Sequence, residues 1–462
     1  MRVVLLIDFG STYTKVTAVD LDSETVLGTA NAYTTVATDI NEGLHLALAR
    51  LEEKTGPLSY EKRLACSSAA GGLRMVTAGL VPELTAEAAR QASLGAGAKV
   101  VKVYSYELTE DDISEIERLK PDIFLLCGGT DGGNKACILH NAVMLSQVSG
   151  DFPVILAGNR SAARDCERLL EGKEVLLCEN VMPKFGVLNI EPAQKKIREV
   201  FLRRIVEAKG LSRAEGLLDG ILMPTPSAVL KAITLLADGT EHEHGMGELI
   251  AVDVGGATTD VYSIASGMPT HSDTVFKGLP EPYAKRTVEG DIGMRYSVGG
   301  IVDAVGMGVI AARSGLSESR CAEMIKTLSE NTEMVPDGGD WEALDFALAS
   351  SAVETAVTRH AGTMEEAYTL MGLTYVQSGK DLTGVSKIVV TGGSLIHTRR
   401  TKEIAAHGLY SPATPQSLKP KRSEILVDRS YILSAMGLLS ESEPEIALRI
   451  MKKELENDGI TE

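Results

Sequence analysis

The sequence lacks the features of membrane, secreted and nucleic-acid-binding proteins. No apolar run approaches the ~18 residues that cross a bilayer, and Asp8 interrupts the N-terminal apolar run before a secretory signal forms. A net charge of −17 leaves no excess of basic residues for a broad nucleic-acid or anionic-membrane surface. The six cysteines form no C-x-x-C pair and no metal-ligand spacing, which favours a reduced, cytoplasmic protein.

Two similar segments stand out in what is present. The first reads Asp8-Phe9-Gly10-Ser11-Thr12-Tyr13-Thr14-Lys15, and the second reads Asp253-Val254-Gly255-Gly256-Ala257-Thr258-Thr259-Asp260. Each follows a short apolar run and precedes another one, so each predicts a strand that ends in a carboxylate, a Gly-rich turn and a second strand. Two such hairpins, far apart in the sequence, indicate two related lobes that face one ligand.

The residue types in these turns suit a nucleotide phosphate. Glycines let backbone N–H groups approach an anion, hydroxyl groups add further donors, and an aspartate can hold hydrated Mg²⁺.

The length and the order of the predicted elements indicate two α/β lobes. A chain of 462 residues is longer than one hydrophobic core usually serves. We expect lobe I over 1–190, connecting helices over 191–245, lobe II over 246–440, and a C-terminal helix and tail over 441–462. In both lobes a buried strand precedes a Gly-rich loop, at 128–133 and at 392–394, which predicts an internal repeat. A helix is expected from Trp341 to Met371.

Five segments, in their order, resemble the actin, hexokinase and heat-shock chaperone ATPase superfamily. They are the two phosphate motifs at 8–15 and 253–260, two connecting helices at 224–237 and 431–439, and an adenosine motif at 389–394. This resemblance implies two ribonuclease-H-like lobes, that is, the actin-like ATPase fold, with ATP and Mg²⁺ in the cleft between them.

A closer resemblance extends over nearly the whole chain. The segments LIDFGSTYTKVTAVD, CSSAAGGLRMV, LLCGGTDGGN, DVGGATTDVYS, RTVEGDIGMR and VVTGGSLI resemble the MutL/GlmL family of glutamate mutase accessory proteins. The resemblance implies an ATP-dependent reactivating chaperone for an adenosylcobalamin-dependent mutase, either glutamate mutase or an aminomutase. ATP binding and hydrolysis would drive the release of damaged cobalamin. The chain has no D-x-H-x-x-G signature, so we do not expect it to hold the corrin as mutases do.

The resemblance also implies roles for individual residues. Asp8 and Asp253 would organise Mg²⁺, through water, and the attacking water molecule, and Asp260 matches a second acidic position of the chaperone-type motif. The expected phosphate-binding residues are Gly10, Ser11, Thr12, Lys15, Gly255, Gly256, Thr258 and Thr259. Gly392, Gly393 and Ser394 would let the adenosine approach the backbone. The charged residues Glu289, Asp291 and Arg295 receive no role.

Three alternatives stay open. A small-molecule kinase of the same superfamily would transfer phosphate to an acceptor other than water. A filament-forming actin relative would polymerise in a nucleotide-dependent way. A hydantoinase-like cyclase has an N-terminal motif that also joins Asp, Gly and Thr. The expected partner is a mutase, without nucleic acid or membrane, and the sequence leaves homo-oligomerisation open.

Overall fold

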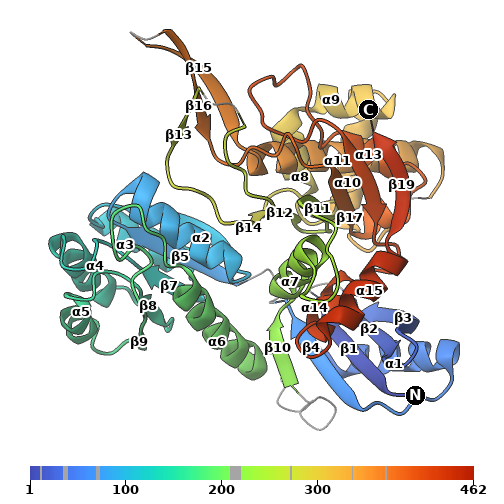
Figure 1. The fold of residues 1–462 in the computed structure, drawn as a ribbon, viewed down its shortest axis with the longest axis horizontal. Coiled ribbons are helices and arrows are strands. Elements are labelled where there is room, and N and C mark those ends of the chain that lie inside the picture. Colours follow the sequence, from blue (N-terminus) through green and yellow to red (C-terminus); the bar gives the residue numbers. More distant parts are fainter. Residues whose placement is uncertain are drawn as a thin grey trace. The chain divides into compact units, whose positions relative to one another are not determined.

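The chain forms two compact units (Figure 1). A computed structural model describes residues 1–10, 13–34, 40–68, 73–208, 220–270, 273–335, 337–369 and 372–461, of which 205–208, 220–222, 369 and 456–461 are described by their backbone alone. The units are Met1–Ala228 and Val229–Glu462, and their boundary falls inside helix α7 (Thr225–Asp238).

The first unit is built on a five-stranded mixed sheet. Its strands are β1 (Val3–Phe9), β2 (Tyr13–Asp20), β3 (Thr25–Tyr33), β4 (Lys62–Ser67) and β10 (Gly220–Pro224), in the order β10-β4-β1-β2-β3. β1, β2 and β3 form an antiparallel meander, whereas β4 is parallel to β1 and β10 is parallel to β4. β1 is buried along its whole length, as expected of a central strand between two covered faces.

A second sheet is inserted between β4 and β10. It contains β5 (Arg74–Gly79), β6 (Lys99–Ser105), β7 (Ile123–Leu126), β8 (Val154–Leu156) and β9 (Val175–Leu177), all parallel, in the order β6-β5-β7-β8-β9. The helices of this unit are α1 (Ile40–Thr55), the π-helical turn η1 (Pro82–Ala86), α2 (Glu87–Gly95), α3 (Glu110–Leu119), α4 (Ala136–Ser146), α5 (Ala163–Leu169) and α6 (Glu191–Ala208). One cluster of buried side chains fills the space between the inserted strands and α3, α4 and α5.

The inserted sheet corrects the predicted internal repeat. The glycine loop at 128–133 follows β7 and therefore belongs to the insertion, so it is not the counterpart of the loop at 392–394. The counterpart in the first unit is the end of β4, because β4 runs parallel beside β1. The prediction that the two glycine loops are counterparts was wrong because a buried strand followed by glycines occurs in parallel sheets of every kind.

The second unit repeats the sheet order of the first. Its strands β11 (Leu249–Val254), β12 (Thr259–Ile264), β14 (Ala284–Glu289), β17 (Lys387–Thr391), β18 (Ser423–Val427) and β19 (Glu456–Thr461) are ordered β14-β12-β11-β17-β18-β19. Three antiparallel strands are again followed by two parallel ones, and β19 adds an antiparallel edge. The shared strand order confirms the predicted fold: both units have the ribonuclease-H-like sheet of the actin-like ATPases.

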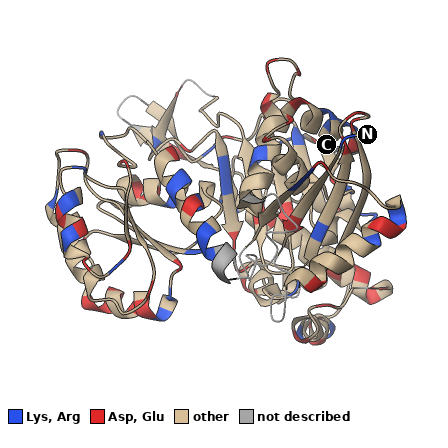
Figure 2. Ribbon diagram, turned by 90° about the horizontal axis from the view of Figure 1, so that it is seen from below, with Lys and Arg blue, Asp and Glu red and all other residues tan. Residues whose placement is uncertain are grey.

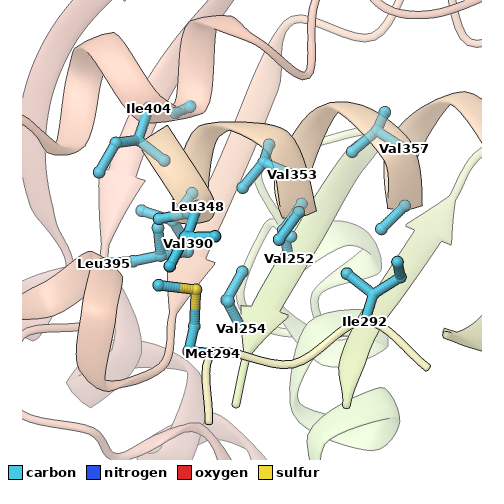
Figure 3. Packing of buried hydrophobic residues seen from close by; sticks show 14 of the residues in the cluster. Val252, Val254, Ile292, Met294, Leu348, Val353, Val357, Val390, Leu395 and Ile404 are labelled. Atoms are coloured by element: carbon cyan, nitrogen blue, oxygen red, sulfur yellow. The ribbon is translucent and has the colours of Figure 1, made fainter. Parts of the chain in front are cut away.

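Helix α11 (Gly339–His360) forms the core of the second unit with the sheet (Figure 3). Its Leu348, Val353 and Val357 pack against Val252 of β11 and Val390 of β17, and all five side chains are buried. Burying each such side chain contributes roughly 1.5–3 kcal/mol relative to leaving it in water. This packing fixes the helix beside the two strands that carry the candidate site.

The remaining helices of the second unit are short or peripheral. They are α8 (Val298–Val305), α9 (Met307–Ser314), α10 (Glu318–Glu330), α12 (Gly393–Ile396), α13 (Thr401–Ala406), α14 (Leu433–Leu439) and α15 (Pro444–Glu454). Among the helices in the described ranges, none is both long and apolar enough to cross a membrane. Along the described helices, Lys and Arg are interspersed with Asp and Glu (Figure 2).

The helix expected from Trp341 to Met371 ends at His360, so that prediction is wrong at its C-terminal end. The chain instead enters a small sheet of β13 (Thr274–Lys277), β16 (Gly372–Ser378) and β15 (Thr363–Thr369), in the order β13-β16-β15. Gly362 lies at the junction, where a Cβ atom would be 2.6 Å from the carbonyl oxygen of Ser378. Pairing of β15 with the next strand, β16, therefore overrides the local helical pattern.

Candidate functional site

The two predicted hairpins share a strand register and one closing backbone hydrogen bond. In the first, the N–H of Gly10 donates to the carbonyl of Tyr13 at 3.1 Å, and in the second the N–H of Gly255 donates to Thr258 at 2.9 Å. The register matches as well, because Asp8 lies opposite Lys15 and Asp253 lies opposite Asp260. The turns thus occupy equivalent positions in the two sheets.

Asp8 is held by side chains of its own unit. It is only 4% exposed, and it accepts a 2.6 Å hydrogen bond from the hydroxyl of Thr225, the first residue of α7. The ammonium of Lys15 lies 4.0 Å from the other carboxylate oxygen. A connecting helix and a neighbouring strand therefore orient this carboxylate from two directions. Ser11 and Thr12, predicted for the same turn, lie outside the described residues.

The donor set around Asp8 fits a hard cation such as Mg²⁺. Its neighbour in the parallel register is Cys66, and burial, followed by the charge of Asp8, raises the pKa of that thiol well above its usual range. The thiol therefore stays protonated and is a poor ligand. The remaining ligands are oxygens, and Mg²⁺ prefers one or two carboxylates with several waters. Within the described residues, no group of three or more His, Cys, Asp or Glu side chains gathers as a metal centre.

The second hairpin carries a different charge arrangement. Asp253 is half-buried at the end of β11. Asp260 is 9% exposed and accepts a 2.8 Å hydrogen bond from Nε of buried Arg286, a residue of β14. Burial lowers the pKa of Arg286, but the charges of Asp260 and Tyr262 and the hydrogen bonds to both residues together raise it above its ordinary value. Asp260 is therefore a charged residue that also braces β12, and the hydroxyl of Thr258 donates to it at 3.2 Å.

A segment after β14 closes over the second turn. The N–H groups of Met294, Arg295 and Tyr296 donate to the carbonyls of Gly255 and Gly256 at 2.8–3.0 Å. The hydroxyl of Thr259, one of the predicted phosphate donors, is buried and donates to Ile292 of the same segment at 3.0 Å.

Two acidic residues without a predicted role lie nearby: Glu289 ends β14, and Asp291 belongs to the segment that follows it. Glu289 lies 2.5 Å and Asp291 lies 3.6 Å from the guanidinium of Arg359 on α11.

The predicted adenosine motif lies beside the second turn. Thr391 is the parallel neighbour of Asp253, and the next residue, Gly392, has φ = 99°. A Cβ atom on Gly392 would lie 2.3 Å from the carbonyl oxygen of Val254, so only glycine fits there. Gly393 is exposed, with no heavy atom within 4 Å of a Cβ built on it, and Ser394 is half-buried.

The second connecting helix is tied to this motif by a residue that the sequence did not reveal. Buried Asp428 accepts from the hydroxyl of Thr391 at 3.2 Å and from the N–H of Ile432 at 2.8 Å, just before α14. The structure therefore brings together Gly255, Gly256, Thr258, Asp253, Asp260 and Gly392 in the second unit. In the first unit it brings together Asp8, Gly10 and Lys15.

Three further supporting residues escaped the sequence reasoning. Thr225 had a local signal, since a threonine between two prolines at the start of a connecting helix is well placed to orient a nearby carboxylate. Arg286 had no signal, and Arg295 was noticed as a charged residue but received no role, because their partners lie 26 and 50 positions away along the chain.

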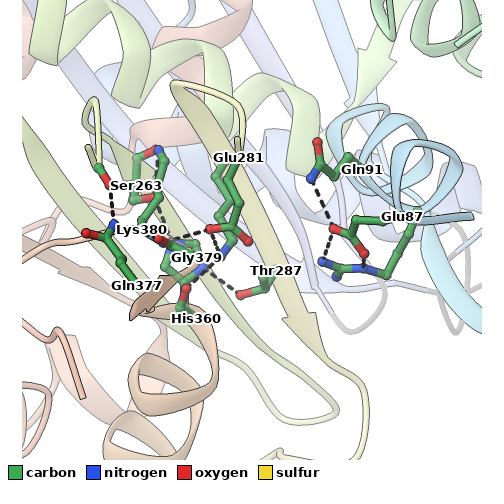
Figure 4. Close-up of polar contacts among 12 residues, drawn as sticks. Glu87, Gln91, Ser263, Glu281, Thr287, His360, Gln377, Gly379 and Lys380 are labelled. Carbon is green, nitrogen blue, oxygen red and sulfur yellow. Dashed lines mark hydrogen bonds and ion pairs between the residues drawn. The ribbon is translucent and has the colours of Figure 1, made fainter. Parts of the chain in front are cut away.

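A buried polar cluster lies on β12, away from the turn (Figure 4). The ammonium of Lys380 donates to the carbonyl of Tyr283 at 2.6 Å and to the hydroxyl of Ser263 at 3.3 Å. Ser263 is also 2.8 Å from His360 at the end of α11. Burial, with the charge of nearby Lys285 as a second cause, lowers the pKa of Lys380 to about 7. The cluster fastens β12 to the base of β16.

Comparison with known proteins gives consistent matches. The family model described as MutL protein matches residues 4–455. Protein MutL of Clostridium tetanomorphum is 48% identical over 459 residues, which cover 98% of this chain and 99% of that protein.

Solved structures resemble the chain more distantly. Nucleotide-free acetone carboxylase has a TM-score of 0.43 and 13% identity, covering 95% of this chain and 70% of that one. The nucleotide-free diol dehydratase-reactivating factor has a TM-score of 0.35 and 14% identity, covering 96% and 99%. At these values the fold is identified by the strand order of the two sheets.

Proposed function

Because the chain belongs to the MutL protein family, we propose that it is a Mg²⁺-dependent ATPase that serves as an accessory protein to a partner enzyme. The observation that carries the proposal is the pair of equivalent hairpins. Each places a strand-end carboxylate next to a turn with the same hydrogen bond, one in each ribonuclease-H-like sheet.

The glycines and the aspartates of the two hairpins would have different roles in binding the nucleotide. Gly10, Gly255 and Gly256 would let the phosphates approach the backbone closely. The N–H groups of Gly10 and Gly255 close the turns themselves, so the N–H of Gly256 would be the glycine donor to phosphate. Asp8 and Asp253 would hold Mg²⁺ through water and orient the attacking water. Bound Mg²⁺ would neutralise the charge that develops on the transferred phosphoryl group.

The other predicted residues would complete the site. Lys15 would contact phosphate, because its cross-strand position opposite Asp8 lies next to the turn. Gly392, Gly393 and Ser394 would let the adenosine lie against the backbone at the end of β17. Asp260, through its ion pair with Arg286, would keep β12 in place under the second turn.

We further propose that the partner is an adenosylcobalamin-dependent mutase, glutamate mutase or an aminomutase, from which the protein releases damaged cobalamin. The support is the chain-long resemblance to glutamate mutase accessory proteins. If the partner prefers one nucleotide state, its affinity and the nucleotide affinity must change by the same factor, typically ~1–3 kcal/mol of coupling.

The test mixes a mutase inactivated with hydroxocobalamin, fresh adenosylcobalamin, this protein and ATP. Mutase activity should return with ATP and stay absent with a non-hydrolysable analogue or with Asp8→Asn. If ATP is hydrolysed but no cobalamin enzyme of the same organism recovers, the reactivation proposal fails. Phosphate transfer to a sugar or a carboxylic acid would then favour the kinase alternative.

A further inference from the structure

Arg295 lies at a point where three parts of the second unit meet. Its own N–H donates to the carbonyl of Gly256 at 2.8 Å, and those of its two neighbours, Met294 and Tyr296, donate to Gly255 and Gly256. Three consecutive residues are thus bonded to the two glycines of the second turn.

The side chain of Arg295 points away from these bonds to two other elements. Its Nη1 lies 3.3 Å from a carboxylate oxygen of Asp345 on α11, and its Nε donates at 3.2 Å to the carbonyl of Met334. Met334 belongs to the connection between α10 and α11. Nη1 also donates to the carbonyl of Met294 at 2.7 Å, which fixes the guanidinium relative to its own backbone.

The turn and this segment are also packed backbone against backbone. A Cβ atom on Gly293 would lie 2.4 Å from the carbonyl carbon of Ala257, so the two backbones are in direct contact. One built on Gly256 would lie 3.8 Å from Cβ of Arg295. We therefore expect a shift of Arg295 to displace the glycine turn, because two closely packed backbones leave no free volume that could absorb the movement.

We propose that Arg295 is a positioning residue for the nucleotide site, and that it makes the geometry of the second turn depend on the α10–α11 connection. The inference rests on the proposed ATPase function. Arg295 would preorganise the second turn, including the N–H of Gly256 that would bind phosphate, while its guanidinium is bonded to Asp345 and Met334. Preorganised donors matter because misplacement by about 1 Å can reduce a rate about 100-fold.

The ion pair of Arg313 with Glu354 supplies a matched control. It also joins a helix to α11, and Arg313 donates to the hydroxyl of Ser351 as well, but no bond links it to the turn. Arg295→Met and Arg313→Met therefore each remove one partly buried arginine ion pair on α11, and only the first touches the glycine turn.

The experiment measures ATP hydrolysis, thermal unfolding and amide hydrogen exchange in these variants. Arg295→Met should lower kcat about 10-fold or more. It should also accelerate exchange at the amides of Gly255 and residues 294–296. Arg313→Met should lower the unfolding temperature to a similar extent and leave kcat within about 2-fold of wild type.

Two milder variants keep the test decisive if Arg295→Met fails to fold. Arg295→Lys cannot reach Asp345 and Met334 in two directions at once, so it should lower kcat about 3-fold to 5-fold. Burial raises the pKa of the Asp345 carboxyl, which Arg295 partly offsets, so Asp345→Asn should fold normally and loosen the guanidinium.

The outcomes distinguish a failure of the positioning role of Arg295 from a failure of the proposed ATPase function. Normal kcat and normal exchange in Arg295→Met or Arg295→Lys would overturn the positioning role. Equal losses of kcat in the Arg295 and Arg313 variants would also overturn it, since they would show a general loss of stability. A wild-type protein that hydrolyses no ATP would instead refute the proposed function, whereas the exchange measurement without nucleotide would still test the link between Arg295 and the turn.

Discussion

The two hairpins share a register and a closing hydrogen bond, but different contacts support them. Asp8 faces a lysine across the strand pair and takes a hydrogen bond from the start of α7, so side chains brace the first turn. Asp253 faces a second carboxylate, and its turn is braced by backbone bonds from 294–296. The same register and closing hydrogen bond therefore form with different supporting contacts in the two units.

The difference suggests a division of labour between the units. The first offers a cation beside its carboxylate, which suits contact with a phosphate oxygen. In the second, the additional carboxylate is neutralised by Arg286, so the net local charge at Asp253 resembles that of a single aspartate. If the two units bind one nucleotide, the first unit would contribute mainly the positive charge of Lys15 to phosphate binding. The second unit would contribute mainly backbone N–H donors.

The largest expected effect comes from the two strand-end carboxylates. Asp8→Asn and Asp253→Asn should each reduce ATP hydrolysis about 1,000-fold, because each removes a charge that organises Mg²⁺ and water. Asparagine preserves the shape, so thermal unfolding should change little. If one of the two variants kept full activity, the equivalence of the hairpins would be broken.

The next prediction concerns the free energy of unfolding and the strand ends that lie beside the two turns. Ser68 donates its N–H to Phe9 at 3.0 Å in the first unit, whereas Gly392 packs directly against the equivalent Val254 in the second. Gly392→Ala should therefore cost about 3 kcal/mol of unfolding free energy through the clash and the positive φ. Gly393→Ala is the matched control and should cost under about 1 kcal/mol. Similar values by denaturant titration would contradict the close approach.

A smaller loss of ATP hydrolysis is expected when the hydrogen bond from Thr225 to Asp8 is removed and Asp8 itself is kept. Thr225→Val removes the 2.6 Å hydrogen bond to the carboxylate and keeps the shape of the side chain. A hydrogen bond to a charged group is worth about 1.5–3 kcal/mol, so hydrolysis should fall about 10-fold. Thr225→Ser restores the hydroxyl and should recover most of the activity. A valine variant as active as the serine variant would show that the brace is dispensable.

The sequence predicted both hairpins because their signals are local: an aspartate, a glycine turn and two short apolar runs. The register of Lys15 and Asp260 follows from the turn length alone. Strand pairing over long distances could not be predicted, since the buried strand Ile123–Leu126 reads like any other and joined the inserted sheet. The supports of the site, such as Arg295 with Asp345, were hidden for the same reason.

A pH effect distinguishes the strands that follow the turns. Ser263 of β12 contacts Lys380, whereas the equivalent position of β2 is the apolar Ala18. Burial lowers the pKa of Lys380 to about 7, below the ordinary value of about 10.4 for lysine. Between these values the unfolded chain binds a proton that the folded chain does not, so stability rises with pH.

The variant Lys380→Met checks this effect. The unfolding free energy of wild type should rise from pH 6.5 to pH 9 by on the order of 1 kcal/mol more than that of the variant. Parallel pH curves for the two proteins would show that Lys380 keeps an ordinary pKa.

The smallest effect is expected from Lys15. Its ammonium lies 4.0 Å from Asp8 and is partly exposed, and such ion pairs contribute little to stability, about 1 kcal/mol at most. Lys15→Met should therefore unfold like wild type while weakening ATP binding about 3-fold to 10-fold through the lost phosphate contact. Unchanged affinity by calorimetry would remove Lys15 from the site and with it the charge difference between the turns.

We propose that both hairpins bind one nucleotide, and amide hydrogen exchange with and without a non-hydrolysable ATP analogue and Mg²⁺ tests this proposal most directly. The account predicts that the analogue slows exchange in both peptides that contain the turns, residues 1–20 and 249–264, and that Asp253→Asn weakens the protection in both. Protection confined to one hairpin, or no protection at a saturating analogue concentration, would contradict the account.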